Sequence, residues 1–141
     1  MRIRDVLQRK GDEVVTITPS ATIADLIRVL GEKNIGAAVV SSDGTTVEGI
    51  VSERDVVRAI GRGEDTVSGA VSTIMTSDVS DCDPGATIDE IMHLMTEHRI
   101  RHVPVVVDGR LIGIVSIGDV VKMRIGELEL EREQLSTYIS S

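Results

Sequence analysis

The chain has 141 residues, 41% of them hydrophobic, and carries a formal net charge of -8 at pH 7. This charge argues against nucleic acid as a partner, because nucleic-acid binding relies on Lys and Arg to neutralise phosphates. No apolar run approaches the roughly 18 residues that span a bilayer, and no apolar export signal follows Met1, so we expect a cytoplasmic protein with no membrane role.

The first half of the chain predicts the order strand, helix, strand, strand, helix. Short β-branched runs alternate with stretches whose apolar residues recur at helical spacing, and Pro and Gly separate them. In chain order, the predicted elements are the strand Val14–Thr18, a helix that Thr22 caps, the hairpin strands Ala37–Ser41 and Val47–Val51, and a helix from Ser52 through Ile60.

The second half predicts the same order again. Its first helix carries a clear start signal, because Thr87 is followed three residues later by Glu90, the spacing of a capping box. The predicted elements are the strand Val79–Cys82, this helix, the hairpin strands His102–Val107 and Leu111–Val115, and a helix that follows Ser116.

The two halves are copies of one unit. The segment Gly49–Val57 reads GIVSERDVV, and Gly113–Val121 reads GIVSIGDVV. Upstream residues such as Pro19 and Pro84 match at a constant offset of 65, which indicates a duplication. A half of about 60 residues is marginal alone, so we expect an α+β fold in which two β-α-β-β-α repeats share one core.

The predicted organisation has three segments. Residues 1–65 form repeat 1 with an N-terminal lead-in, residues 66–122 form repeat 2 with its own lead-in, and residues 123–141 form an extra C-terminal helix.

The C-terminal helix carries a heptad pattern. Its positions are spaced 4-3-4-3-4, with one arginine among apolar residues. The stretch is shorter than a secure coiled coil, so two interpretations stay open: a helix with a partner, or an amphipathic helix folded back on its own domain. We call these positions the seam: Val121, Ile125, Leu128, Arg132, Leu135 and Ile139.

The repeated motif Ser-x-x-Asp is the main candidate site. Ser52 with Asp55, and Ser116 with Asp119, each stand where an apolar strand turns into a helix. One interpretation is a capping box and nothing more. The other is a nucleotide site, in which free amides at the helix start bind phosphate and the carboxylate accepts hydrogen bonds from a ribose diol.

Together with Ile100-Arg101-His102-Val103-Pro104-Val105 and Ile74-Met75-Thr76, the paired motif makes the chain resemble a tandem pair of CBS domains, also called a Bateman module. The resemblance implies two repeats related by a pseudo-two-fold axis and clefts between them for adenosine-containing ligands such as AMP, ADP, ATP, NAD or S-adenosylmethionine. It also implies a homodimer of such pairs.

The resemblance assigns roles within those clefts. Asp55 and Asp119 are expected to hold riboses, Ser52 and Ser116 to approach phosphates, and Arg101 and His102 to neutralise them. Because the chain has no Trp or Phe, aliphatic side chains and backbone must hold a nucleobase. Ile50 and Ile114, on the strands that precede the motifs, are the candidates.

The two clefts are expected to differ in charge. Gly36 stands where repeat 2 has Arg101, and Gly118 stands where repeat 1 has Arg54. Arg54 therefore makes the Asp55 cleft the better candidate for a phosphorylated ligand, whereas the Asp119 cleft depends on Arg101 or His102. Two interpretations of Gly36 stay open. Its lack of a side chain either lets a ligand or the opposing strand approach closely, or has only a structural role where its strand starts.

Metal and catalytic sites are not expected. Of the three histidines, His93, His98 and His102, the first lies inside a predicted helix and the last begins a strand, and no CxxC or HxxxH spacing unites them. The single cysteine, Cys82, is expected to be an ordinary buried or half-buried thiol. No nucleophile–base arrangement or phosphate-cradling loop is evident.

The sequence therefore predicts a non-enzymatic regulatory module. It needs no cofactor, binds an adenine nucleotide or NAD as a regulatory ligand, and signals to an effector protein. The alternative is a homodimeric interaction module whose clefts are vestigial.

Overall fold

The computed structural model describes residues 1–63 and 67–140, and the predicted segment boundary between residues 65 and 66 lies outside them. The chain divides into two compact units, each assembled from separate parts of the sequence. Unit 1 contains Met1–Asp12, Asp81–Val105 and Gly113–Ser141, and unit 2 contains Glu13–Ser80 and Val106–Ile112.

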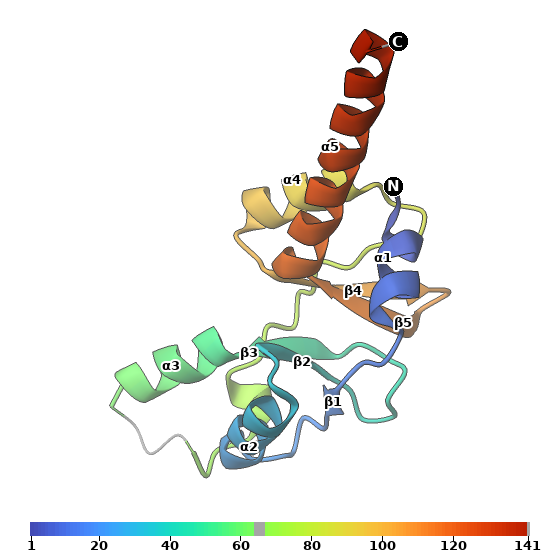
Figure 1. The fold of residues 1–141 in the computed structure, drawn as a ribbon. Helices are drawn as coiled ribbons and strands as arrows, with labels where there is room; N and C mark the ends of the chain where they lie inside the picture. The colour runs from blue at the N-terminus through green and yellow to red at the C-terminus, as the bar shows by residue number, and fades with distance from the viewer. Residues whose placement is uncertain (64–66, 141) are drawn as a thin grey trace. The chain divides into compact units, whose positions relative to one another are not determined.

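Unit 2 is built on a three-stranded sheet in the order β1-β2-β3 (Figure 1). Strand β1 runs parallel to β2, and β2 runs antiparallel to β3. The elements are β1 (Thr16–Ile17), α2 (Ile23–Lys33), β2 (Ala37–Val40), β3 (Gly49–Ser52), α3 (Glu53–Gly61) and a 3-10 turn, η1 (Val71–Thr73).

The predicted elements of repeat 1 are confirmed, and β1 is shorter than expected. Thr22 caps α2, accepting a hydrogen bond from the Asp25 amide at 3.0 Å. Strand β1 spans two residues rather than the predicted Val14–Thr18, because it lies at the sheet edge and pairs only with β2.

The core of unit 2 is aliphatic and includes a residue from the segment that leads into repeat 2. Val71, in η1, is fully buried among side chains of α2 and the sheet. Its amide donates to the Ala21 carbonyl at 2.8 Å. The buried set is Ile17, Ile23, Leu26, Leu30, Ala38, Val40, Val51, Val56 and Val71.

Unit 1 contains four helices or strands of repeat 2 and one helix from the N-terminus. These are α1 (Ile3–Lys10), α4 (Ile88–His98), β4 (His102–Val107), β5 (Arg110–Ser116) and α5 (Ile117–Ser140), with the tip of the β4–β5 hairpin assigned to unit 2. The predicted strand Val79–Cys82 is reduced to one parallel bridge between Cys82 and Val105.

The two lead-ins, residues 1–12 and 67–80, each pack with the repeat that does not follow them directly. In unit 1 the Ile3 amide donates to the Ala86 carbonyl at 2.9 Å, and in unit 2 the Ile23 amide donates to the Gly69 carbonyl at 2.9 Å. Each compact unit therefore combines one repeat with the lead-in that precedes the other repeat.

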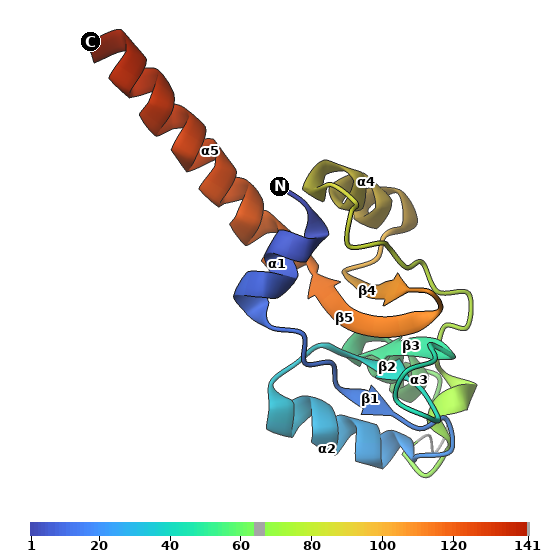
Figure 2. The ribbon, with the colours of Figure 1, turned by 90° about the vertical axis from the view of Figure 1, so that its right-hand side faces the viewer.

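Helix α5 is a continuous helix of 24 residues, so the predicted C-terminal helix is an extension of the last helix of repeat 2 rather than a separate element. Within unit 1, α1 lies beside its first turns and its C-terminal half projects away (Figures 1 and 2). The residues from Leu128 to Ser140 are all exposed, so this stretch is not folded back on its own domain. Among residues 1–63 and 67–140, no helix combines the length and apolar character needed to cross a bilayer.

Candidate functional site

The turn between β3 and α3 holds the first Ser-x-x-Asp motif as a complete capping box. The Asp55 amide donates to Ser52 Oγ at 3.3 Å, and the Ser52 amide donates to Asp55 Oδ2 at 2.8 Å. The Ser52 hydroxyl adds a bond to the same Oδ2 at 3.0 Å. The capping interpretation is thus confirmed for this motif, while its role in ligand binding stays a prediction.

Three of the other predicted residues of repeat 1 lie next to this turn. The Gly36 carbonyl accepts a hydrogen bond from the Glu53 amide at 2.9 Å. Ile50 is half-buried and pairs with Thr76 through two backbone hydrogen bonds of 3.0 and 2.9 Å. Arg54 is exposed on the first turn of α3.

The turn between β5 and α5 repeats the construction in unit 1. The Ser116 amide donates to Asp119 Oδ2 at 2.8 Å, and the Asp119 amide donates to Ser116 Oγ at 3.2 Å. The Ile117 amide donates to the Arg101 carbonyl at 2.8 Å, which is the counterpart of the Glu53–Gly36 bond. Among the described residues, both aspartates are engaged through Oδ2, and their Oδ1 atoms accept no hydrogen bond.

A residue that the sequence analysis missed, Lys10 at the end of α1, binds the second motif. Its ammonium donates to Asp119 Oδ2 at 2.7 Å and to the Ile114 carbonyl at 2.8 Å. The two lead-ins carry a signal for this difference. Leu7 and Met75 are equivalent positions in them, so Lys10, three residues after Leu7, corresponds to Asp78, three residues after Met75. The two sites therefore differ in charge at a position outside the repeated motif.

The environment of Asp119 favours its ionised form. Partial burial raises the pKa of this carboxyl, but the hydrogen bond from Lys10, the Ser116 amide and the Lys10 charge together outweigh it. The pKa of Asp119 therefore lies below its ordinary value of 3.8.

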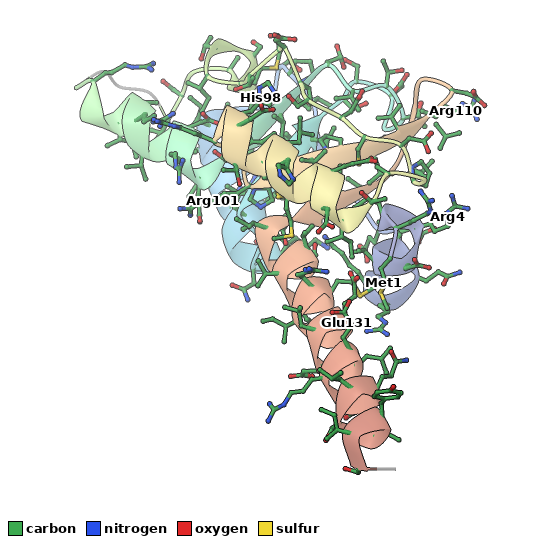
Figure 3. The ribbon with its side chains drawn as sticks, turned by 90° about the horizontal axis from the view of Figure 1, so that it is seen from above. Met1, Arg4, His98, Arg101, Arg110 and Glu131 are labelled. Atoms are coloured by element: carbon green, nitrogen blue, oxygen red, sulfur yellow. The ribbon has the colours of Figure 1, made fainter. Side chains whose placement is uncertain are left out.

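Arg101 and His102 lie on the segment that enters β4. Arg101 is exposed, and its carbonyl accepts the hydrogen bond from the Ile117 amide at the start of α5. Figure 3 labels its side chain. His102 is half-buried at the first position of the strand. His98 ends α4 (Figure 3). Within the described part of the chain, no three His, Cys, Asp or Glu side chains are grouped as metal ligands.

Comparison with known proteins gives the same family for both repeats. The family model described as the CBS domain matches residues 3–62 and 71–126. The chain is 36% identical to the CBS domain-containing protein CBSX3, mitochondrial, from Arabidopsis thaliana, over 97% of this chain and 71% of that protein.

Solved structures show the same fold. The CBS-domain-containing protein ATU1752 from Agrobacterium tumefaciens superposes with a TM-score of 0.84 at 46% identity, covering 88% of this chain and 99% of that one. The CBS domain pair of protein MJ0100, solved in complex with 5-methylthioadenosine and S-adenosyl-L-methionine, gives a TM-score of 0.78 at 22% identity, covering 87% and 98%.

Proposed function

Because the chain belongs to the CBS-domain family, we propose that it is a regulatory module that binds adenosine-containing ligands at the Asp55 and Asp119 turns. The observation that supports this most directly is the shared construction of these turns. Each places a carboxylate one turn into a helix, with Oδ2 engaged by the protein and Oδ1 left for a ligand. A ribose diol offers the two donors that such a carboxylate accepts.

The remaining parts of a nucleotide have partners nearby. The protein already engages the amides of Glu53 and Asp55 in α3 and those of Ile117 and Asp119 in α5. The amides between them, those of Arg54 and Gly118, together with the adjacent cations, suit phosphate oxygens. Half-buried Ile50 and Ile114 offer aliphatic surface for a base. The adenosine derivatives bound to the CBS pair of MJ0100 support this ligand class. AMP, ADP, ATP and NAD are the ligands we propose, and the module acts by binding, so that an effector protein reads its ligand-bound state.

The first test is to denature the purified protein and analyse the supernatant by ultraviolet spectroscopy and mass spectrometry. Calorimetric titration of the ligand-free protein with AMP, ATP, NAD and S-adenosylmethionine follows. We expect Asp55→Ala and Asp119→Ala each to remove one site, and the double variant to bind none of these ligands.

A matched control is available in α2. Asp25 closes a capping box with Thr22 in the same way as the two site aspartates close theirs, so Asp25→Ala tests whether loss of a cap alone weakens binding. Binding by the double variant equal to that of the wild type would exclude the proposed function.

A second candidate function is a homodimeric interaction module, and the exposed seam of α5 favours it. Ile125, Leu128, Leu135 and Ile139 are between 47% and 74% exposed, an arrangement that a partner helix would cover. Deleting residues 127–141 should then halve the mass measured by light scattering. A truncated protein with the mass of the full chain would exclude α5 as the organiser of a dimer.

A further inference from the structure

A small pocket beside Asp119 is rich in basic side chains. It has a volume of about 170 Å³ and is formed by α1 and α5 alone. We call it the α1–α5 pocket; its lining residues are Val6, Arg9, Lys10, Asp119, Lys122 and Met123.

The positive charge of this pocket is only partly compensated. Lys10 pairs with Asp119 at 2.7 Å, whereas Arg9 and Lys122 form no ion pair with any described residue. Three cations therefore face one carboxylate, in a chain whose formal net charge is -8. Local excess charge of one sign, opposed to that of the whole molecule, attracts small ions of the other sign.

Lys10 is held beside Asp119, and Lys122 lies on the same face of α5. Lys10 is held by two hydrogen bonds, to Asp119 Oδ2 and the Ile114 carbonyl, so one of its three protons remains for a ligand. Lys122 follows Asp119 by three residues on α5, which places both on one helix face. Val6 and Met123, which are 3% and 4% exposed, supply the apolar part of the lining.

We propose that the α1–α5 pocket binds the phosphate of an adenosine ligand whose ribose is held by Asp119, and that this site therefore selects phosphorylated ligands over neutral nucleosides. This inference rests on the proposed function. A neutral nucleoside that hydrogen-bonds to Asp119 competes with Lys10 for this carboxylate and supplies no negative charge for the Lys10 ammonium. A phosphate gives Lys10, Arg9 and Lys122 an anion to bind.

The Asp55 turn lacks this arrangement. The carbonyl of Ile50, the counterpart of Ile114, receives the Thr76 amide at 2.9 Å instead of an ammonium, and Asp78 stands at the position of Lys10 in the lead-in. The inferred preference for phosphorylated ligands is therefore the reverse of the one that Arg54 suggests from the sequence.

The experiment isolates the Asp119 site in an Asp55→Ala background and compares AMP with adenosine by calorimetry. We expect AMP to bind at least about tenfold more tightly than adenosine, because charge-assisted hydrogen bonds are roughly twice as strong as neutral ones. Arg9→Gln and Lys122→Gln are each expected to weaken AMP about fivefold and leave adenosine unchanged. The difference between the ligands should shrink between about 50 mM and about 500 mM NaCl.

The variants are made at Arg9 and Lys122 because the Lys10 hydrogen bonds also connect α1 to the second motif. A Lys10 variant would therefore change the stability of the protein as well as its ligand affinity. Arg110→Gln is the matched control: it removes one positive charge from an exposed position of β5 outside the pocket. Thermal unfolding of each variant verifies that it is folded.

The outcomes separate this inference from the proposed function. Equal affinities for AMP and adenosine, unchanged by Arg9→Gln or Lys122→Gln, would overturn the inference and leave adenosine binding intact. If neither ligand binds even the wild-type protein, the proposed function fails, and titration with pyrophosphate then tests the pocket itself. Pyrophosphate binding that both Gln variants weaken would keep the pocket as an anion site, and its absence would overturn it.

Discussion

Leu7 lies against the backbone of Gly113 so closely that a Cβ atom added to that glycine would stand 2.6 Å from Leu7 Cδ2. The other unit repeats the relationship with Met75 and Gly49, where an added Cβ would stand 2.7 Å from Met75 Sδ and 2.9 Å from the Thr76 carbonyl oxygen. The glycine of each Gly-Ile-Val-Ser segment is thus the place where a lead-in contacts a strand of the sheet.

Gly49→Ala is expected to destabilise the protein by about 1–3 kcal/mol, the usual cost of overpacking. The Thr76 carbonyl belongs to the backbone and pairs with Ile50, so it cannot move aside easily. Urea unfolding measures the loss. Gly31→Ala is the control, because that position in α2 has no neighbour within 4 Å, and it should gain up to about 1 kcal/mol. Equal stability of Gly49→Ala and the wild type would contradict the close contact.

Gly113→Ala should cost less than Gly49→Ala and should be rescued by a second change. All three atoms nearest to the added Cβ belong to the Leu7 side chain, which can rotate or be shortened. In the double variant Gly113→Ala/Leu7→Ala, we expect the two effects on the free energy of unfolding to be less than additive. Strict additivity would show that the two residues do not interact.

The Lys10–Asp119 pair should make stability depend on pH in acid. The pKa of Asp119 is lowered from 3.8 in the folded protein, so the unfolded chain binds this proton more readily. The contribution is therefore full above the unfolded pKa and declines as pH falls through 3.8 toward the folded value. Urea unfolding between about pH 7 and about pH 3 should show the wild type losing its advantage over Asp119→Asn in that window.

Lys10→Met provides the comparison for this pH dependence. It removes both the hydrogen bond and the charge through which Lys10 lowers the pKa of Asp119. The acid-dependent part of the stability should become smaller in this variant. An unchanged pH profile would mean that Lys10 does not influence the titration of Asp119.

Cys82 should react slowly with thiol reagents in the native protein. Burial raises the pKa of this thiol to about 12, with a further contribution from the negative charges of Asp81 and Asp83. The thiolate is the reactive form, so at pH 8 we expect modification by Ellman's reagent to be at least about a hundredfold slower than in the urea-unfolded chain. Equal rates would show that the thiol is accessible and ionised.

Self-association through the seam of α5 can be tested with charge. Leu128→Glu and Leu135→Glu place a carboxylate on the seam, whereas Leu130→Glu places it on another face of the same helix; all three leucines are 47% to 60% exposed. If the seam holds a dimer, the first two variants should lower the mass measured by analytical ultracentrifugation, and the third should not. The same mass for all three would exclude the seam as an interface.

The order of elements within each repeat could be predicted from the sequence because caps and turns are local, whereas α1 and η1 in the lead-ins were not predicted. Thr22, Ser52 and Thr87 each precede their helix and accept the expected amide hydrogen bond. The lengths of the first strand in each repeat could not be predicted in this way. Both strands depend on pairing with a distant segment, and only Cys82 of Val79–Cys82 forms a bridge.

The candidate site was predictable where it is repeated and not where it is unique. Ser52, Asp55, Ser116 and Asp119 are recognisable because the motif occurs twice. Lys10 lies more than a hundred residues before Asp119, and its counterpart in the other lead-in is Asp78, so no shared residue marks the position. Only the packing of α1 with repeat 2 brings Lys10 and Asp119 together.

The exchange of lead-ins means that the backbone passes from one compact unit to the other four times, after residues 12, 80, 105 and 112. A chain cut near its midpoint would therefore yield two fragments that each retain a lead-in belonging to the other. When the two fragments are mixed, each supplies the lead-in that completes the compact unit of the other. The fold is therefore suited to split-protein complementation.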